Sequence, residues 1–186
     1  MGIKIVNLNN IDKIDLTIDG ADQVDKDFNG IKGGGAALLW EKIVAVNSKR
    51  NVWIVDGSKL SDRIGSFPLP VEITPFGGSQ LFKKFQKDQL NPVLRVNVDN
   101  QPVLTDSKNY IIDLHLQTIK NPRALADYLI RSVGVVEHGL FLDIVDQVIV
   151  GQKEGVKVIN NPHRVNFTDN SRQFDQALCD NIQQDD

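Results

Sequence analysis

The chain has few of the features that mark secreted, membrane-spanning or nucleic-acid-binding proteins. Its 186 residues include one cysteine, Cys179, so no internal disulfide can form, as is usual in a reducing cytoplasm. No apolar run reaches the length of a membrane span, and the first residues lack the pattern of a secretory signal. The net charge of −3 provides no electrostatic footprint for nucleic acid. We therefore expect a soluble cytoplasmic protein that binds neither nucleic acid nor membrane.

Several catalytic and cofactor-binding patterns are also absent. The three histidines, His115, His138 and His163, have no metal-ligand spacing, so structural or surface roles are favoured over a metal site. No Gly-x-Ser-x-Gly elbow occurs, which argues against a serine nucleophile of that kind. The glycines at 33 to 35 are followed by Leu38, where a dinucleotide fingerprint needs its third glycine.

Two carboxylates follow a short apolar run near the start of the chain. The run Leu16 to Ile18 has the β-branched, apolar character of a buried strand. Asp19 and Asp22 therefore fall where a strand ends and a loop opens, which is where α/β folds place ligands.

A lysine and three glycines come next. After Lys32, the glycines at 33 to 35 allow backbone N–H groups to approach a ligand closely. Residues 36–46 then predict a helix, whose first turn has unpaired N–H donors. The pattern predicts an anion-binding corner beside a lysine.

Glu41 lies on an apolar part of that helix. Its neighbours at i±3 and i±4 are all apolar, namely Ala37, Leu38, Val44 and Ala45. A carboxylate in such surroundings is partly desolvated, which raises its pKa toward the value that a general base needs. Periodicity leaves a second interpretation equally open, in which Glu41 reaches past Trp40 into solvent.

These residues belong to an ordered series of motifs that resembles ribose-5-phosphate isomerase of type A. The series covers about residues 2–158 and consists of Asp19-Gly-Ala-Asp22, Lys32-Gly-Gly-Gly-Ala-Ala37, Glu41-Lys42, Asp56 to Lys59, Phe67-Pro-Leu-Pro-Val71, Gly134-Val-Val136 with Gly139-Leu-Phe141, and Gly155-Val-Lys157. The resemblance implies isomerisation of ribose 5-phosphate, a sugar phosphate, to ribulose 5-phosphate through an enediolate, in the non-oxidative pentose phosphate pathway. It implies no metal or organic cofactor, and it implies a homo-oligomer such as a homodimer.

The resemblance also implies a role for each residue of the series. Glu41 would be the base that moves a proton between C1 and C2, while Asp19 and Asp22 would assist ring opening and hydroxyl proton transfer. Lys32 and the amides of the glycine loop would stabilise the enediolate oxygen. The residues expected to bind substrate are Gly20, Ala21, Gly33, Gly34, Gly35 and Lys59.

The chain departs from the family pattern at its start. The family carries opening βα units and a Thr/Ser/Gly loop that grips the substrate phosphate, whereas residues 1–18 contain only Thr17 of such residue types. A βαβ unit alone needs about thirty residues. We therefore expect an α/β domain that is truncated at its N-terminus. Gln23 and Trp40 also depart from the family, which usually has an acid and often a basic residue at these positions.

Strand and helix patterns predict two units. The first is a Rossmann-like α/β unit with a parallel sheet, built from strands at 4–8 and 15–19, a helix at 36–48 and a strand at 52–55. The second has the order βαββαβ of a ferredoxin-like unit, with elements at 71–74, 78–89, 93–98, 110–116, 122–133 and 135–142.

The expected domain organisation is an α/β domain with a ferredoxin-like α+β domain inserted into it. The first comprises residues 1–68 and 143–159, including a last apolar strand at 147–151, and the second comprises residues 69–142. Residues 160–186 form a polar C-terminal tail, for which a short helix around 172–182 and disorder both stay open.

Two alternative functions remain open. Related folds serve as sugar-phosphate sensors in transcription regulators, and fold alone cannot separate a sensor from an enzyme. A sensor needs the anion-binding corner but has no use for a buried base, so the presence of Glu41 favours the enzyme. No helix-turn-helix segment with a basic face precedes the domain, which also argues against a regulator. The third possibility is an inactive truncated paralogue.

Overall fold

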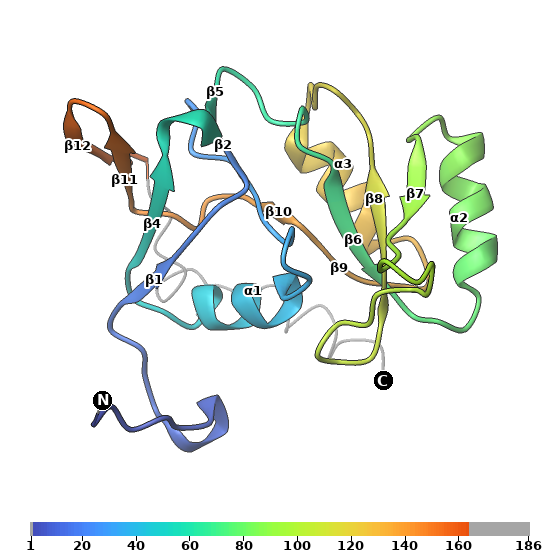
Figure 1. The fold of residues 1–186 in the computed structure, drawn as a ribbon, viewed down its shortest axis with the longest axis horizontal. Coiled ribbons are helices and arrows are strands. Elements are labelled where there is room, and N and C mark those ends of the chain that lie inside the picture. Colours follow the sequence, from blue (N-terminus) through green and yellow to red (C-terminus); the bar gives the residue numbers. More distant parts are fainter. Residues whose placement is uncertain (1, 164–186) are drawn as a thin grey trace, which may run out of the picture.

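A computed structural model describes residues 2–163 of the chain (Figure 1). Its α-helices are α1 (Leu38–Val46), α2 (Gly78–Lys87) and α3 (Pro122–Ile130), and its short 3₁₀ helices are η1 (Leu8–Asn10) and η2 (Gly57–Lys59). The strands of the described residues form three four-stranded sheets. None of the described helices is both long enough and apolar enough to cross a membrane.

The first sheet has the order β1-β4-β11-β12. Its strands are β1 (Thr17–Asp19), β4 (Asn51–Asp56), β11 (Gln147–Gln152) and β12 (Gly155–Asn160). Strands β1, β4 and β11 run parallel, whereas β12 returns antiparallel to β11. The parallel sheet that the alternating pattern predicted is therefore confirmed, and the carboxyl ends of β1 and β4 lie at the same edge.

The second sheet is small and was not predicted from the sequence. Its order is β10-β3-β2-β5, with strands β2 (Gln23–Asp25), β3 (Gly30–Ile31), β5 (Leu60–Ser61) and β10 (Leu140–Phe141). Strand β3 ends immediately before Lys32. A Cβ atom on Gly30 would lie 2.4 Å from the Trp53 ring, so only glycine lets β3 pass this close to β4.

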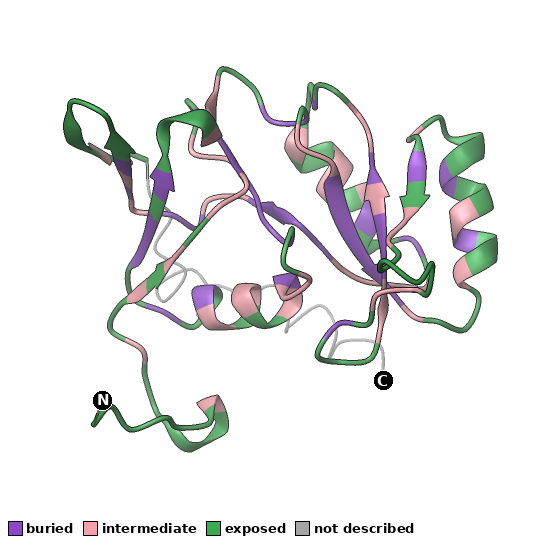
Figure 2. Cartoon of the chain, viewed as in Figure 1, coloured by how far each residue is buried: buried purple, intermediate pink, exposed green. Residues whose placement is uncertain are grey.

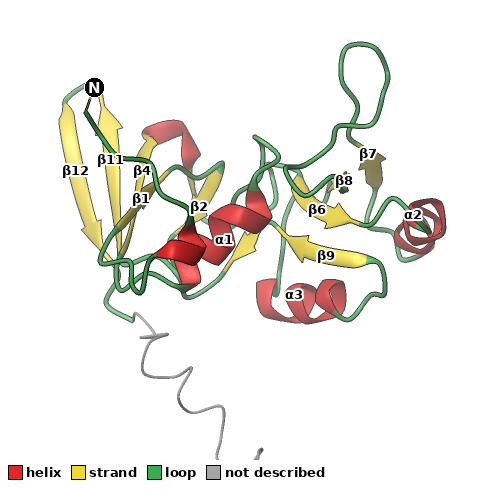
Figure 3. Cartoon of the chain, turned by 90° about the horizontal axis from the view of Figure 1, so that it is seen from below, coloured by secondary structure: helices red, strands yellow, loops and turns green. Residues whose placement is uncertain are grey.

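The third sheet has the order β7-β8-β6-β9 and is antiparallel throughout. Its strands are β6 (Leu69–Ile73), β7 (Pro92–Leu94), β8 (Tyr110–Leu114) and β9 (Val135–His138). Helices α2 and α3 follow β6 and β8 in the chain, which gives the order βαββαβ. Helix α1 lies between this sheet and the β1-β4-β11-β12 sheet (Figure 3).

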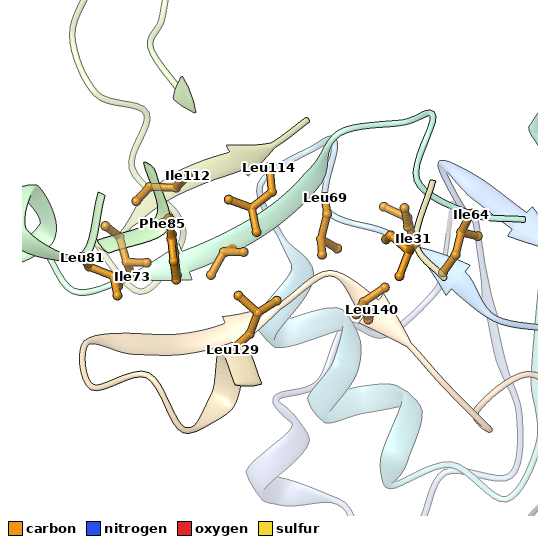
Figure 4. Close-up of a cluster of buried hydrophobic side chains, with 12 residues drawn as sticks. Ile31, Ile64, Leu69, Ile73, Leu81, Phe85, Ile112, Leu114, Leu129 and Leu140 are labelled. Atoms are coloured by element: carbon orange, nitrogen blue, oxygen red, sulfur yellow. The ribbon is translucent and has the colours of Figure 1, made fainter. Parts of the chain in front are cut away.

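The larger hydrophobic core joins the second and third sheets. Leu81 and Phe85 of α2 and Leu129 of α3 pack against one face of the β7-β8-β6-β9 sheet. Ile31 and Leu140 belong to the same cluster, and Figure 4 shows them at the end nearer β3. Because Ile31 is fully buried, the backbone that leads into Lys32 is held by the core of the β6–β9 unit.

A second core cluster lies on one face of the β1-β4-β11-β12 sheet. Its members are Val24, Ala45, Trp53, Val55, Phe141, Ile144, Val145, Val148 and Val150. Ala45 brings the last turn of α1 into this cluster, and the helix also contacts β6 and β9 of the third sheet. Figure 2 shows the buried residues gathered in β4, β6 and β10, whereas most of the β11–β12 hairpin is exposed.

Three expectations for strands were wrong in part. Residues 4–7 form no strand, because they are exposed and pair with no neighbouring strand of the described chain. The strand expected at 135–142 is divided by Gly139 into β9 and β10, which belong to different sheets. A Cβ atom on Gly139 would lie 2.2 Å from the Lys32 carbonyl oxygen, so the chain crosses here only without a side chain. The strand expected at 93–98 ends at Leu94, as β7. Strand β12 was missed. The expected helix around 172–182 and Cys179 lie outside the described residues.

Candidate active site

The structure brings four of the predicted site residues together around one buried ammonium group. Asp19 is the last residue of β1, and Lys32 directly follows β3. Glu41 lies in the first turn of α1. Lys32 Nζ lies 2.9 Å from Asp19 Oδ2 and 3.3 Å from Glu41 Oε2, and it donates a hydrogen bond to the Gly20 carbonyl oxygen at 2.5 Å. The Lys32 side chain is 4% exposed, so this charge is compensated by protein groups instead of by water.

The aromatic ring of Phe141 lies beneath this ammonium group. Its ring centroid lies 5.4 Å from Lys32 Nζ and 5.0 Å from Lys42 Nζ, and its side chain is fully buried. Both ammonium groups are within the range of a cation–π interaction. The sequence had placed Phe141 in a motif but had given it no role.

Glu41 has a carboxylate that is only partly exposed. Its side chain is 28% exposed, and the buried atom Oε2 accepts no hydrogen bond of good geometry from the described residues. Burial raises the pKa of Glu41, Lys32 opposes that rise, and the negative charges of Asp19 and Asp22 add to it. Of the two interpretations left open by periodicity, the structure has the partly desolvated one.

Asp22 binds the backbone of the glycine loop. Its Oδ2 accepts a hydrogen bond from the Gly34 N–H at 2.8 Å. A Cβ atom on Gly34 would lie 2.7 Å from Asp22 Oδ1, so a side chain at this position would collide with the carboxylate. Gly33 has a φ of 108°, a conformation that favours glycine. Asp22 and the loop therefore form one unit.

Helix α1 begins after this loop, at Leu38 instead of at the predicted residue 36. Ala37 at its N-cap offers no side-chain hydrogen bond, so the first N–H groups of the helix have no capping partner. The positive end of the helix dipole lies beside the glycines. The helix start that the sequence predicted beside the glycines is thus present, and anion binding there stays a prediction.

Arg95 is a residue that sequence reasoning missed. Its Nη1 donates hydrogen bonds to the carbonyl oxygens of Gly33 at 2.8 Å and Gly34 at 3.1 Å. Its Nε and Nη2 atoms bind the two carboxylate oxygens of Asp113 at 2.8 and 2.5 Å. Arg95 lies about sixty residues from the loop in sequence and belongs to no motif, so no local signal indicated this contact.

Lys42 ties α1 to strand β9. Its Nζ donates to Glu137 Oε1 at 2.7 Å and to the His138 carbonyl oxygen at 2.6 Å. Burial lowers the pKa of Lys42, and Glu137 opposes that shift. Because Lys42 follows Glu41 in the helix, the same contact fixes the rotation of α1 that presents Glu41.

His138 is buried against Lys42, which agrees with one of the two roles, structural or surface, expected for the histidines. Burial and the Lys42 charge lower the pKa of His138 to about 4, below its ordinary value of 6.5. The unfolded chain therefore binds one more proton than the folded chain between these pH values. We predict that the free energy of unfolding falls as the pH is lowered from 6.5 towards 4, and that His138→Gln makes this dependence shallower.

Chemical denaturation at a series of pH values checks this prediction. His163→Gln is the matched control, because His163 is exposed and its replacement should leave the slope of the wild type unchanged. Equal slopes for His138→Gln and the wild type would contradict the prediction.

The other predicted binding residues differ in the contacts that they make. Gly20 lies at the end of β1 and provides a carbonyl oxygen to Lys32, and Ala21 packs against the second core cluster. Lys59 ends η2, which is capped by Asp56 accepting from the Ser58 N–H. Within residues 2–163 the Lys59 side chain has no hydrogen bond or ion pair. No contact in the structure joins Lys59 to Lys32 and its partners. Gly35 is exposed, and its N–H forms no hydrogen bond with another described residue.

The site combines a buried ammonium group with three carboxylates, those of Asp19, Asp22 and Glu41. A partly desolvated carboxylate is suited to accepting a proton, and a buried ammonium beside it is suited to stabilising a negative oxygen. Among residues 2–163, no group of three or more histidine, cysteine, aspartate or glutamate side chains could hold a metal ion.

Comparison with known proteins gives one consistent result. The model of the family described as ribose 5-phosphate isomerase A (phosphoriboisomerase A) matches residues 1–155. The ribose-5-phosphate isomerase A of Bifidobacterium adolescentis is 63% identical over 163 residues, which are 88% of this chain and 70% of the relative.

Solved structures agree with the sequence comparison. A D-ribose-5-phosphate isomerase in complex with phospho-erythronic acid superposes with a TM-score of 0.82 at 39% identity, covering 85% of this chain and 70% of that one. The ribose 5-phosphate isomerase A of Neisseria gonorrhoeae gives a TM-score of 0.80 at 39% identity, covering 87% and 70%.

Proposed function

The chain belongs to the ribose 5-phosphate isomerase A family, and from this premise we propose how its residues interconvert ribose 5-phosphate and ribulose 5-phosphate. It is an aldose–ketose isomerase, and the sensor alternative is not favoured. The observation that carries the proposal is the buried ammonium of Lys32 between the carboxylates of Asp19 and Glu41. These three residues are all members of the family motifs in the sequence.

Glu41 is the base that moves the proton. Its carboxylate takes the proton from C2 of the open-chain aldose, the electrons of that C–H bond form the C1–C2 double bond, and the C1 oxygen becomes negative. Glu41 then returns the proton to C1. The hydroxyl proton moves from the C2 oxygen to the C1 oxygen, which completes the ketose. A positioned base of this kind contributes about 10²–10⁴-fold to the rate.

Lys32 stabilises the negative charge that develops on the substrate oxygen. Its Nζ lies 3.3 Å from Glu41 Oε2, so the two charges attract each other while Glu41 is ionised. When Glu41 accepts the proton it becomes neutral, and this attraction is lost at the moment when the enediolate oxygen becomes negative. The Lys32 ammonium is then free to interact with that oxygen, which favours the transition state over the bound substrate.

Asp19 and Asp22 serve ring opening and the hydroxyl proton transfer. The two carboxylates flank Gly20 and Ala21, with Asp19 at the end of β1 and Asp22 in the segment that follows, and Gly20 and Ala21 are the proposed border of the substrate site. Asp22 also holds the Gly34 amide at 2.8 Å, so that amide already has an acceptor. Within the glycine loop, the N–H groups of Gly33 and Gly35 are therefore the proposed donors to substrate oxygens. Lys59 as a substrate-binding lysine stays a prediction.

The raised pKa of Glu41 predicts a pH dependence of activity. Only the ionised carboxylate accepts a proton, so kcat/KM should fall as the pH is lowered through the pKa of Glu41. Because burial raises that pKa, the midpoint of this acid limb should lie above the ordinary value of 4.5.

A pH–rate profile of the purified protein checks this, with an incubation at each pH followed by assay at neutral pH to show that the protein recovers fully. An acid limb at or below pH 4.5 would contradict a desolvated Glu41.

The direct test of the function is formation of ribulose 5-phosphate from ribose 5-phosphate by the purified chain. Calorimetric titration with ribose 5-phosphate is run beside it. Turnover that is lost in Glu41→Gln supports the proposal, whereas binding without turnover by the wild type would favour the sensor.

We further propose the finer organisation expected from the sequence. The order βαββαβ and the antiparallel order β7-β8-β6-β9 support a ferredoxin-like unit at residues 69–142, inserted into an α/β domain at 1–68 and 143–159. A homo-oligomeric state and a cytoplasmic location also stay predictions. Sedimentation of the purified protein would test the oligomeric state.

A further inference from the structure

We propose that Arg95, held by Asp113, is a positioning residue for the isomerase reaction, because it fixes the orientation of the peptide groups in the glycine loop. The inference rests on the proposed function of that loop as a donor of hydrogen bonds to the substrate. It assigns a catalytic contribution to the β7-β8-β6-β9 sheet, which supplies none of the residues around Lys32.

The Arg95 guanidinium bridges Asp113 and the glycine loop. The guanidinium binds both oxygens of Asp113 in a bidentate pair, and both side chains are 16% exposed. Such charge-assisted pairs are geometrically specific. The remaining nitrogen, Nη1, is directed at the carbonyl oxygens of Gly33 and Gly34. Asp113 therefore orients the guanidinium, and the guanidinium orients the loop.

The first consequence concerns the peptide group between Gly33 and Gly34. Its carbonyl oxygen accepts from Arg95, and its N–H donates to Asp22. The C=O and N–H of a trans peptide point in opposite directions. This peptide plane is therefore held at both ends, with Asp22 on one side and Arg95 on the other.

The second consequence concerns the peptide group between Gly34 and Gly35. Arg95 donates a hydrogen bond to the carbonyl oxygen of this peptide group, which belongs to Gly34. The N–H of the same group belongs to Gly35 and therefore points away from Arg95. That N–H has no hydrogen bond with another described residue. Arg95 thus orients the Gly35 N–H towards the side of the loop on which Asp22 lies.

The loop needs such a restraint because of its composition. Three consecutive glycines have more backbone freedom than any other tripeptide, and a Cβ atom on Gly35 would meet nothing within 4 Å. Packing therefore does not hold this part of the loop, whereas the Arg95 hydrogen bonds do.

Asp113 is one of three acids on the face of the sheet that faces α1. Asp113 is opposite Pro70, and Glu72 is opposite Glu137, so these side chains lie on one face. Glu137 binds Lys42 of α1 at 2.7 Å. Asp113 thus acts on the glycine loop and Glu137 acts on the helix of Glu41. This face is a platform for both parts of the site.

The test is Arg95→Met, which keeps an unbranched stem but removes the guanidinium. The probe for the site is phospho-erythronic acid, because its carboxylate is planar and shares its negative charge between two oxygens, as an enediolate does. We expect kcat to fall by at least about tenfold and the inhibition constant of phospho-erythronic acid to rise, with a smaller change in KM. A role in folding alone would lower the active fraction, and hence apparent kcat, without changing the inhibition constant.

The matched control is Arg123→Met. Arg123 lies on α3 and forms an ion pair of the same chemistry with Asp143. Neither residue has a hydrogen bond or ion pair with the glycine loop. It should leave both kcat and the inhibition constant unchanged. Arg95→Lys should recover part of the loss, because an ammonium can bind a carbonyl oxygen but cannot bind Asp113 and two carbonyls together.

Asp113→Asn provides a second variant if Arg95→Met folds poorly. It keeps the arginine but weakens its orientation, so the inhibition constant should rise in the same direction by a smaller factor. An unchanged inhibition constant in soluble Arg95→Met and Asp113→Asn would overturn the inference. If the wild type itself had no turnover, the proposed function would fail instead, so the two failures are distinguishable.

Discussion

Replacing Glu41 by glutamine is expected to lower kcat by about 10²–10⁴-fold while leaving the affinity for ribose 5-phosphate largely intact. Glutamine has nearly the same shape as glutamate, but its neutral amide cannot act as the base that accepts the substrate proton. The neighbouring ammonium of Lys32 keeps its contacts with Asp19 and with the Gly20 carbonyl oxygen. The substitution therefore removes the proton transfer and leaves most of the binding surface in place.

Steady-state kinetics together with calorimetric binding of ribose 5-phosphate separate the two effects. Glu154→Gln is the matched control, because Glu154 is exposed in the turn before β12 and should not affect kinetics. A loss of affinity as large as the loss of kcat would show that Glu41 binds substrate and is not the base.

Lys32→Met is expected to have the second large effect, with kcat lowered by about 10²–10³-fold and KM raised much less. The charge that Lys32 is proposed to stabilise develops in the transition state, so loss of Lys32 should affect turnover more than binding. The same substitution leaves Asp19 and Glu41 without their shared cation. Because Lys32 lowers the pKa of Glu41, that pKa should rise further in the variant.

The acid limb of the pH–rate profile therefore moves to higher pH in Lys32→Met, which gives a readout that a loss of folded protein does not produce. Thermal unfolding of the same samples corrects kcat for the folded fraction. Lys153→Met, at an exposed position before β12, is the control and should behave like the wild type. A change in KM alone, with kcat preserved, would contradict the role proposed for Lys32.

Much of the site could be predicted because its residues are close together in the sequence. Asp19 and Asp22 were expected at the end of a buried strand, and β1 does end at Asp19, but Leu16 and Ile18 are exposed, so the burial was predicted wrongly. The glycine loop and the helix that follows it were expected from composition, and the boundary of α1 differed by two residues. Local signals of this kind depend on backbone preferences and on apolar periodicity, which a sequence displays directly.

The remainder depends on contacts between distant segments. Whether Glu41 is partly buried could not be decided by periodicity, because the answer depends on Lys32 and Asp19, which approach α1 from the ends of β3 and β1. The small strands β2, β3 and β5 were missed, because two or three residues are too few to display a period. The division of the expected strand at Gly139 was also missed, since it is required only by the close approach of the Lys32 backbone.

The sequence by itself determined the family, the reaction and the order of the main elements. Those follow from ordered motifs, from the residue types that acid–base chemistry needs, and from periods within single segments. The tertiary structure alone decided the environment of each charge: the buried ammonium of Lys32, the raised pKa of Glu41 and the hold of Arg95 on the glycine loop. Charges and hydrogen bonds act over a few ångströms of space, whatever the separation in sequence, and the sequence does not contain those distances.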